Sequence, residues 1–167
     1  MSMDGFRFLD SATREVMRAW FDREPGPDAM PWTPLRSSLA ESRVALISSA
    51  GISLLDDAPF DQDGERLDPW WGDPTYRVLP RETTTGQVRV SHLHMDPRPA
   101  AEDLDCLLPL RRLDELVEAG VVGSSAPNHY SIMGYILKPR QLVEETAPAL
   151  AGALVGDEVD LALLVPV

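Results

Sequence analysis

The stretch SRVALISSAG, residues 42–51, decides the fold of this chain of 167 residues. Its four consecutive apolar residues, Val44 to Ile47, are typical of a strand that is covered on both faces, as in a parallel sheet. Small residues follow the strand from Ser48 to Gly51. Such residues can let the backbone approach a ligand, although a tight turn is the plainer interpretation of this feature alone.

Further strands and helices are predicted on both sides of this stretch. Their ranges are 10–24, 109–120 and 138–154 for helices, and 76–80, 88–94 and 159–167 for strands, with 121–126 as a short strand or turn. Apolar strands separated by helices predict a three-layer α/β fold, in which helices cover both faces of a mostly parallel sheet. Pro148 should kink or restart the last helix. Residues 53–75 are predicted to form a long polar loop.

The chain is expected to be one domain. Residues 1–42 would form a helix and a proline-rich arm, and residues 43–167 would form the α/β body. Asp10 or Ser11 should cap the first helix, and Trp32 should hold the arm against the body.

Charge and composition narrow the possible partners and locations. The net charge of −12 makes nucleic acid and anionic membranes poor partners. The sequence shows no signal peptide, and no apolar run approaches the roughly 18 residues that a membrane span needs. One cysteine, Cys106, allows no internal disulfide, which predicts a cytoplasmic protein. Cys106 lies in an apolar run and is expected to be buried.

The three histidines form the first candidate site. In a strand, His92 and His94 would point to the same side, with Asp96 beside them and His129 coming from elsewhere in the chain. Together these residues could hold a divalent metal such as Zn²⁺ or Fe²⁺. They could equally transfer protons or contact a small-molecule substrate, or they could be hydrogen-bonded polar residues without a ligand. Spacing alone leaves these alternatives open.

The last stretch, Leu161 to Val167, reads as a buried strand. A chain that ends there leaves sheet backbone and apolar surface without a covering helix. The fold is therefore expected to be incomplete at its C-terminus and to need a partner subunit, a homodimer or an added strand.

Five segments resemble, in the same order, the family of glycine/sarcosine/betaine reductase component B and D-proline reductase, also called the selenoprotein B family. They are VALISSAG (44–51), GDPTYRVLP (72–80), VRVSHLHMD (88–96), LLPLRRLDELVEAGVVGSSAPNHYSIMGYI (107–136) and VDLALLVPV (159–167). The resemblance covers most of the chain, from residue 43 to residue 167, and the run from Pro109 to Ile136 is its most specific part.

The resemblance implies an oxidoreductase, or the N-terminal portion of one, that uses a selenol or thiol to cleave a small amino-acid-like substrate reductively. In many relatives, the strand that matches residues 161–167 is followed by a selenocysteine or cysteine, two residues, and a cysteine. Val167 is therefore expected to precede a UGA codon, which standard translation reads as a stop. A deliberately shortened chain and a natural short form are the alternatives. Residues 1–167 would then contain no cofactor of their own.

The matched motifs also imply roles for individual residues. His92, His94 and His129 would orient the substrate or transfer protons. The residues implied to line the substrate pocket are Ser48, Ser49, Gly51, Asp73, Tyr76 and Tyr130. Asp73 could instead anchor a loop. In the family, a pyruvoyl group on a partner subunit activates the substrate amine, and a selenolate or thiolate at a helix N-terminus attacks the activated substrate.

Three interpretations therefore compete. The first is a reductase of this type, acting with a dithiol/disulfide couple. The second is a metal-dependent enzyme or metal-binding protein that uses His92, His94 and His129. The third is a non-catalytic subunit of a reductase complex. The sequence does not name the substrate, because fold similarity does not fix chemistry.

Overall fold

The structure is a computed structural model that describes residues 7–22, 33–68 and 70–167. The chain divides into two compact units, Met1–Pro34 and Leu35–Val167. In the first unit, α1 (Ser11–Phe21) follows Asp10, whose Oδ1 accepts hydrogen bonds from the backbone N–H groups of Ala12 and Thr13 at 3.0 and 3.1 Å. This confirms the predicted cap. The predicted contact of Trp32 lies outside the described residues.

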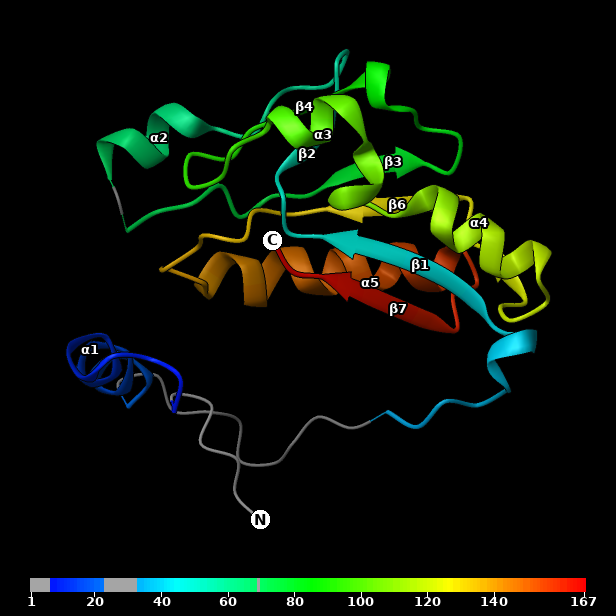
Figure 1. Ribbon diagram of the computed structural model, residues 1–167, viewed down its shortest axis with the longest axis horizontal. Coiled ribbons are helices and arrows are strands. Elements are labelled where there is room, and N and C mark those ends of the chain that lie inside the picture. The colour runs from blue at the N-terminus through cyan, green and yellow to red at the C-terminus, as the bar shows by residue number, and fades with distance from the viewer. Residues whose placement is uncertain (1–6, 23–32, 69) are drawn as a thin grey trace. The chain divides into compact units, whose positions relative to one another are not determined.

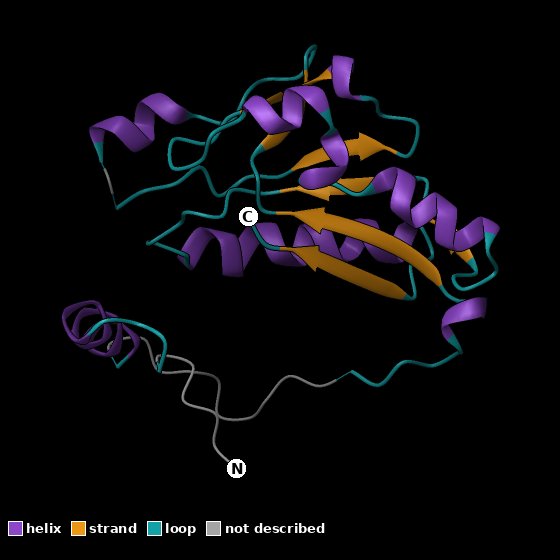
Figure 2. Ribbon diagram, in the orientation of Figure 1, coloured by secondary structure: helices purple, strands orange, loops and turns teal. Residues whose placement is uncertain are grey.

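The second unit alternates strands with helices (Figure 1). Its elements in chain order are η1 (Leu39–Glu41), β1 (Arg43–Ser48), β2 (Ile52–Leu54), α2 (Gln62–Leu67), β3 (Arg77–Pro80), η2 (Thr85–Gln87), β4 (Val88–Val90), α3 (Arg98–Glu102), η3 (Leu104–Cys106), α4 (Leu110–Glu118), β5 (Ser124–Ser125), β6 (Asn128–Ser131), η4 (Leu142–Thr146), α5 (Ala147–Gly156) and β7 (Leu161–Val165). Figure 2 shows the strands of the main sheet side by side, with helices around them.

The main sheet is built around β1. β7 runs parallel to β1 along one edge, from the pair Val44–Leu161 to the pair Ser48–Val165. β5 and β6 follow one another along the other edge and are also parallel to β1. β3 lies antiparallel to β6, while β2 and β4 form a separate antiparallel pair. The predicted α/β fold with a mostly parallel sheet is confirmed.

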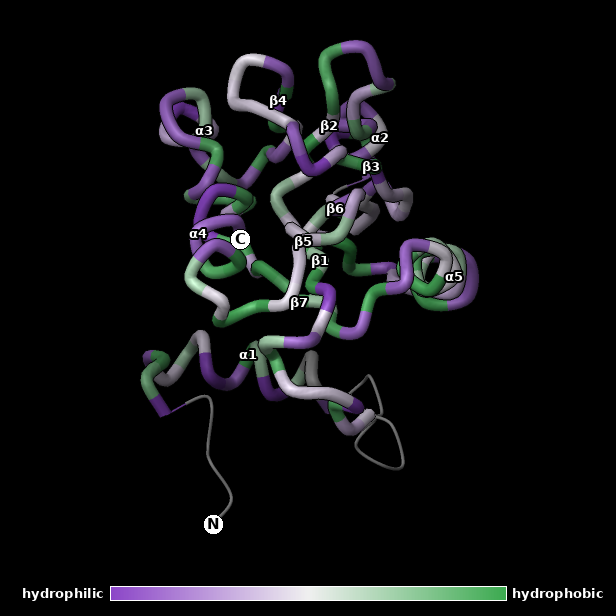
Figure 3. Tube along the Cα trace, turned by 90° about the vertical axis from the view of Figure 1, so that its right-hand side faces the viewer, coloured by the Kyte–Doolittle hydropathy of each residue, from purple (hydrophilic) through white to green (hydrophobic). Residues whose placement is uncertain are grey.

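Helices cover both faces of this sheet. Because successive side chains of a strand point to opposite faces, β1 contributes to two apolar clusters. Leu46 packs with Leu113 of α4 in one cluster, and Ile47 packs with Leu150 of α5 in the other. Figure 3 shows α4 and α5 on opposite sides of the strands. The three predicted layers are therefore present, with β1 buried between them.

The region after β1 departs from the prediction in two places. Residues 53–75 do not form one long loop, because most of β2 and all of α2 fall within them. Asp61 starts α2 by accepting hydrogen bonds from two backbone N–H groups of its first turn, at 3.0 and 2.9 Å. The strand predicted over 88–94 ends at Val90. The chain turns there, since the ring of His92 accepts the backbone N–H of His94 at 3.2 Å.

Two further features differ from the sequence-based expectations. The segment around His129 forms strand β6, which was not predicted. Cys106 ends the short η3 helix and is exposed, so the expectation that it is buried is wrong. The apolar run around Cys106 is broken into short helical turns, and its leucines rather than the thiol face the core.

The last helix confirms the prediction for Pro148. This residue lies in the first turn of α5, where its missing N–H is tolerated. The preceding segment η4 is a π-helix, so the helical turn widens just before the proline. The wider turn makes room for the proline ring, which in a regular α-helix would clash with the carbonyl four residues earlier.

β7 is a strand, as predicted, but in this chain it is not buried. Leu163 is 50% exposed and Leu164 is 67% exposed, because β7 is an edge strand that pairs only with β1 within the described residues. An apolar cavity of about 280 Å³ lies beside it, lined by residues that include Ile47, Leu150 and Leu164. Within the described parts of the chain, no helix is both long enough and apolar enough to cross a bilayer.

Candidate functional site at the carboxyl end of the sheet

Three chain segments meet just beyond the carboxyl end of β1. Gly51 donates its backbone N–H to the carbonyl of Ile132 at 3.0 Å, and its own carbonyl accepts the N–H of Ser91 at 2.9 Å. Gly51 has a φ of +66°, and a Cβ atom there would lie only 2.6 Å from the Ser91 carbonyl oxygen. The glycine is therefore required for close backbone packing. This packing holds the residues after β4 and after β6 next to the end of β1.

The end of β7 reaches the same place. Ser49 donates its N–H to the carbonyl of Val165 at 3.1 Å, and its Oγ accepts the N–H of Val167 at 2.9 Å. A Cβ atom on Gly134 would lie 3.0 Å from the Ser49 carbonyl and 3.1 Å from that of Val167. Ser48 is fully buried, and its Oγ accepts the N–H of Ala50 at 3.3 Å. The predicted residues Ser48, Ser49 and Gly51 thus shape the backbone of this end of the sheet.

A buried carboxylate lies at this end, on α2. Glu65 is only 3% exposed, and its Oε1 lies 2.8 Å from Nε2 of His94. A carboxylate only accepts hydrogen bonds, so Nε2 of His94 carries the hydrogen and donates it. The second oxygen, Oε2, is buried and has no hydrogen-bond partner among the described residues. Buried polar atoms are nearly always paired, which makes this oxygen the most unusual feature of the site.

The structure brings His92 and His94 together, as predicted. Their ring centroids are 6.0 Å apart in an edge-on arrangement, and the ring of Tyr135 lies 4.2 Å from that of His94. Nδ1 of His92 accepts the backbone N–H of His94, so the neutral ring carries its hydrogen on Nε2. That Nε2 is buried and unpaired within the described chain. Burial, and then the charge of His94, lower the pKa of His92, while the charge of Glu65 opposes this shift.

His129 does not join this cluster. Its ring is fully buried in the sheet, where Nδ1 accepts the backbone N–H of Leu46 at 3.0 Å and Nε2 lies 3.2 Å from Oγ of Ser125. β5 and β6 both pair with β1, but the chain between them, which includes Pro127, leaves a gap in this pairing. In the gap, the imidazole of His129 accepts an N–H of β1 in place of a backbone carbonyl. Burial lowers the pKa of His129 from 6.5 to about 4, so the ring is neutral at pH 7. With both nitrogens engaged, His129 stabilises the sheet.

The structure does not bring together the four residues of the metal-binding alternative, His92, His94, Asp96 and His129. Asp96 is exposed and forms an ion pair with Arg98 at 2.6 Å, and His129 lies within the sheet. Over residues 7–22, 33–68 and 70–167, no group of three or more His, Cys, Asp or Glu side chains is placed to hold a metal ion. The prediction assumed that the strand continues through His94 to Asp96, whereas it ends at Val90.

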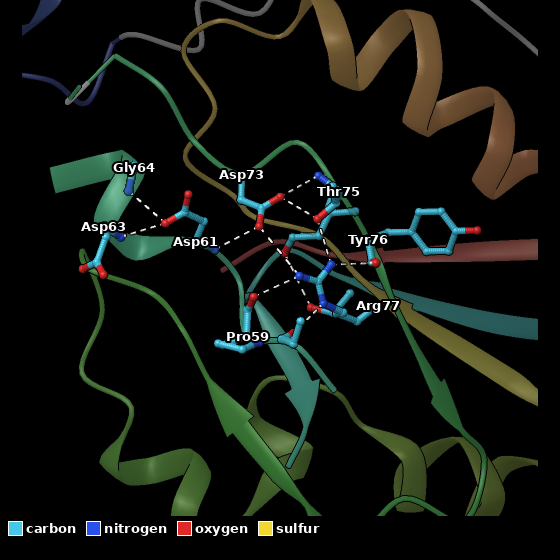
Figure 4. Close-up of polar contacts among 11 residues, drawn as sticks. Pro59, Asp61, Asp63, Gly64, Asp73, Thr75, Tyr76 and Arg77 are labelled. Carbon is cyan, nitrogen blue, oxygen red and sulfur yellow. Dashed lines mark hydrogen bonds and ion pairs between the residues drawn. The ribbon is translucent and has the colours of Figure 1, made fainter. Parts of the chain in front are cut away.

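Asp73 anchors the loop before β3, which was the alternative role suggested for it (Figure 4). Its Oδ2 accepts the backbone N–H of Asp61 at 2.9 Å, and its Oδ1 accepts both the N–H and the hydroxyl of Thr75, at 2.9 and 2.5 Å. Arg77 lies 3.7 Å from the same carboxylate and stacks over the ring of Phe60. Because Asp61 caps α2, this network fixes the helix that carries Glu65.

Tyr76 and Tyr130 lie together, but in the apolar cluster on the α5 face of the sheet. Their ring centroids are 6.0 Å apart. The hydroxyl of Tyr130 donates to Oδ2 of Asp157 at 2.9 Å. Burial and this hydrogen bond raise the pKa of Tyr130. Tyr130 is 1% exposed, so its ring is not open to a ligand in this structure.

Sequence reasoning missed Glu65, the partner of His94. Nothing in the local pattern around Glu65 distinguishes it from the neighbouring acidic residues, since its burial depends on packing between α2 and the segment after β4. The capping pattern at Asp61 could have revealed the helix, although not the contact.

The sequence of the chain is similar to that of a known reductase subunit. Over 133 residues, which are 80% of the chain, the sequence is 29% identical to D-proline reductase subunit gamma of Acetoanaerobium sticklandii. The chain is similar to a reductase subunit. It spans about half the length of that relative, 52%. No family model matches the sequence, and no solved structure matches it. The similarity supports a relationship to the family suggested by the motifs.

Proposed function

We propose that this chain belongs to a reductase complex in which it holds and protonates a small amino-acid-like substrate. The observation that carries this proposal is the pairing of buried Glu65 with His94 beyond the carboxyl end of a parallel sheet. Ligands of open α/β folds bind at this end of the sheet. The similarity to D-proline reductase subunit gamma supports the choice of reaction.

The proposed reaction cleaves a C–N bond with two electrons and two protons. A selenolate or thiolate attacks the carbon, and the electron pair of the C–N bond leaves with the nitrogen, which takes up one proton. A second thiolate then attacks the bound selenium or sulfur, and the carbon leaves with the other proton. The thiol or selenol pair is oxidised to a disulfide or selenenylsulfide, and the substrate is reduced. In this proposal His94 supplies the proton that the nitrogen takes up, and the second thiol, which loses its proton before it attacks, supplies the other.

The nucleophile is proposed to lie on a segment beyond Val167 or on a partner subunit. The one cysteine of this chain, Cys106, is exposed on η3 and has no second thiol to form a disulfide with. Val167 lies beside Ser49 and Gly134, at the end of the sheet that carries the proposed site. The exposed leucines of β7 and the apolar cavity beside them support a covering element there.

The test is an activity assay on the complex that co-purifies with this chain from its native cells. The complex is incubated with D-proline and a dithiol, and 5-aminopentanoate, the product of ring opening at the Cα–N bond, is measured by mass spectrometry. The His94→Ala variant should be slower by roughly 100-fold or more, the usual contribution of a general acid. The Glu144→Gln variant, which changes an exposed glutamate on η4, is the matched control.

Two results would contradict the proposal. If an intact complex forms no product, D-proline is excluded as the substrate. Product formation that is equal in the wild-type and His94→Ala complexes would exclude a catalytic role for this site, and would favour a non-catalytic subunit that only supports its partner. The cytoplasmic location stays a prediction from the single cysteine.

A further inference from the structure

We propose that Glu65 is a ligand-binding residue whose Oε2 accepts a hydrogen bond from a protonated amine. This inference rests on the proposed function in one respect, since it uses the same site. It adds a residue that the sequence motifs did not assign and the chemical class of the group that this residue receives.

One carboxylate oxygen of Glu65 is buried without a partner among the described residues. Glu65 is 3% exposed, and Oε2 has no hydrogen-bond partner within the part of the chain that the structure describes. A buried carboxylate oxygen without a donor is strongly destabilising compared with one that is hydrogen-bonded. A folded protein that keeps such an oxygen gains stability when a donor arrives. The site is therefore prepared for a group that donates hydrogen bonds.

Among the described residues, no arginine or lysine side chain pairs with the carboxylate of Glu65. Glu65 forms no ion pair with arginine or lysine among the described residues, and its single polar partner is His94, through Oε1. The lowered pKa of His92 keeps the neighbouring ring neutral. The net charge of the whole chain is −12. Because His94 pairs with Oε1, Oε2 is left to form a charge-assisted hydrogen bond with a ligand cation.

The side chains around Glu65 hold its carboxylate in place. His94 uses Nε2 to hold Glu65, and Tyr135 packs against the His94 ring, so the carboxylate has a fixed orientation. The Asp73 network fixes the start of α2, which carries Glu65. Preorganised acceptors bind a cation with less loss of side-chain entropy than mobile ones. Glu65 is thus held ready for binding instead of having to rearrange.

A water molecule or a neutral hydroxyl could also donate to Oε2, so the test must separate charge from hydrogen bonding. The probes are propylammonium chloride, propanol and sodium propionate, which share one carbon chain. Each is titrated at pH 7 and constant ionic strength into the full chain labelled with ¹⁵N. The readouts are the ring nitrogen resonances of His94 and His92.

The variants are Glu65→Gln and, as a matched control, Glu144→Gln. The first keeps the size of the side chain and removes its charge. The second makes the same change on an exposed glutamate that pairs with Arg140. Amide spectra check that both variants fold. The wild-type titrations with three probes test the proposal even if Glu65→Gln does not fold, because they need no variant.

The expected result is a saturable change at His94 and His92 with propylammonium, and none with propanol or propionate. Glu65→Gln should weaken the binding by about tenfold or more, since hydrogen bonds to charged groups are among the stronger ones. Glu144→Gln should bind as the wild type does. Equal responses to the amine and the alcohol, no response to any probe, or unchanged binding in Glu65→Gln would each overturn the proposal. No turnover is measured, so a failed reductase assay does not affect this outcome.

Discussion

Replacing His129 with asparagine should remove a large part of the pH dependence of stability of the second unit. The imidazole is fully buried, and its pKa is about 4 in the fold compared with 6.5 in the unfolded chain. Between these values the unfolded chain binds more protons, so the free energy of unfolding falls as the pH falls from 6.5 towards 4. Below about 4 the loss is complete.

The size of this effect follows from the two pKa values. At about 1.4 kcal/mol per pH unit, the full loss is roughly 3 kcal/mol, of which about 2 kcal/mol appears between pH 7 and pH 5. In His129→Asn, Oδ1 takes the position of Nδ1 and can still accept the N–H of Leu46. His129→Leu removes this acceptor, so at pH 7 it should be less stable than His129→Asn by about 1–3 kcal/mol.

Urea unfolding followed by far-ultraviolet circular dichroism at pH 7, 6 and 5 measures both effects. The wild type should lose about 2 kcal/mol more between pH 7 and pH 5 than His129→Asn does. Carboxylates that titrate in this range contribute equally to both proteins and cancel in the difference. Parallel pH profiles for the two proteins would refute the assignment of His129 as a buried neutral acceptor.

Three further predictions concern packing, a buried hydroxyl and the edge strand. Gly72→Ala should destabilise the protein by about 1–3 kcal/mol in urea unfolding, because a Cβ atom there overlaps the carbonyl oxygen of Tyr135; an unchanged midpoint would contradict that contact. Tyr130→Phe should cost about 1 kcal/mol through the lost hydrogen bond to Asp157, and Asp157→Asn should reduce that difference. Leu164→Asp should change the stability of the isolated chain by less than about 0.5 kcal/mol, yet abolish co-purification of a partner that covers β7.

The fold could be predicted from the sequence where local pattern and final environment agree. The apolar run of β1 required cover on both faces, and α4 and α5 provide it. Pro148 required an interruption of the last helix, and a π-helical segment precedes it. β7 shows the limit of such reasoning. Its apolar sequence indicates the environment that the strand requires, whereas its exposure depends on what covers it.

The site could be predicted only in part. His92 and His94 do lie together, but they are brought together by a turn closed by the His92 ring rather than by alternation along a strand. Glu65 is 27 residues away from His92 in the sequence, and only packing of α2 reveals it. The burial of His129 depends on the gap between β5 and β6, which no local pattern shows.

We propose above that this chain forms the substrate-holding part of a thiol- or selenol-dependent reductase, with the nucleophile on a segment beyond Val167 or on a partner subunit. The most direct test is to sequence the DNA that follows codon 167. We expect a UGA or cysteine codon, two further codons, a cysteine codon and then a helix-forming stretch in the same frame. A frame without such a motif would contradict the placement of the nucleophile beyond Val167 and would leave only a partner subunit to supply it.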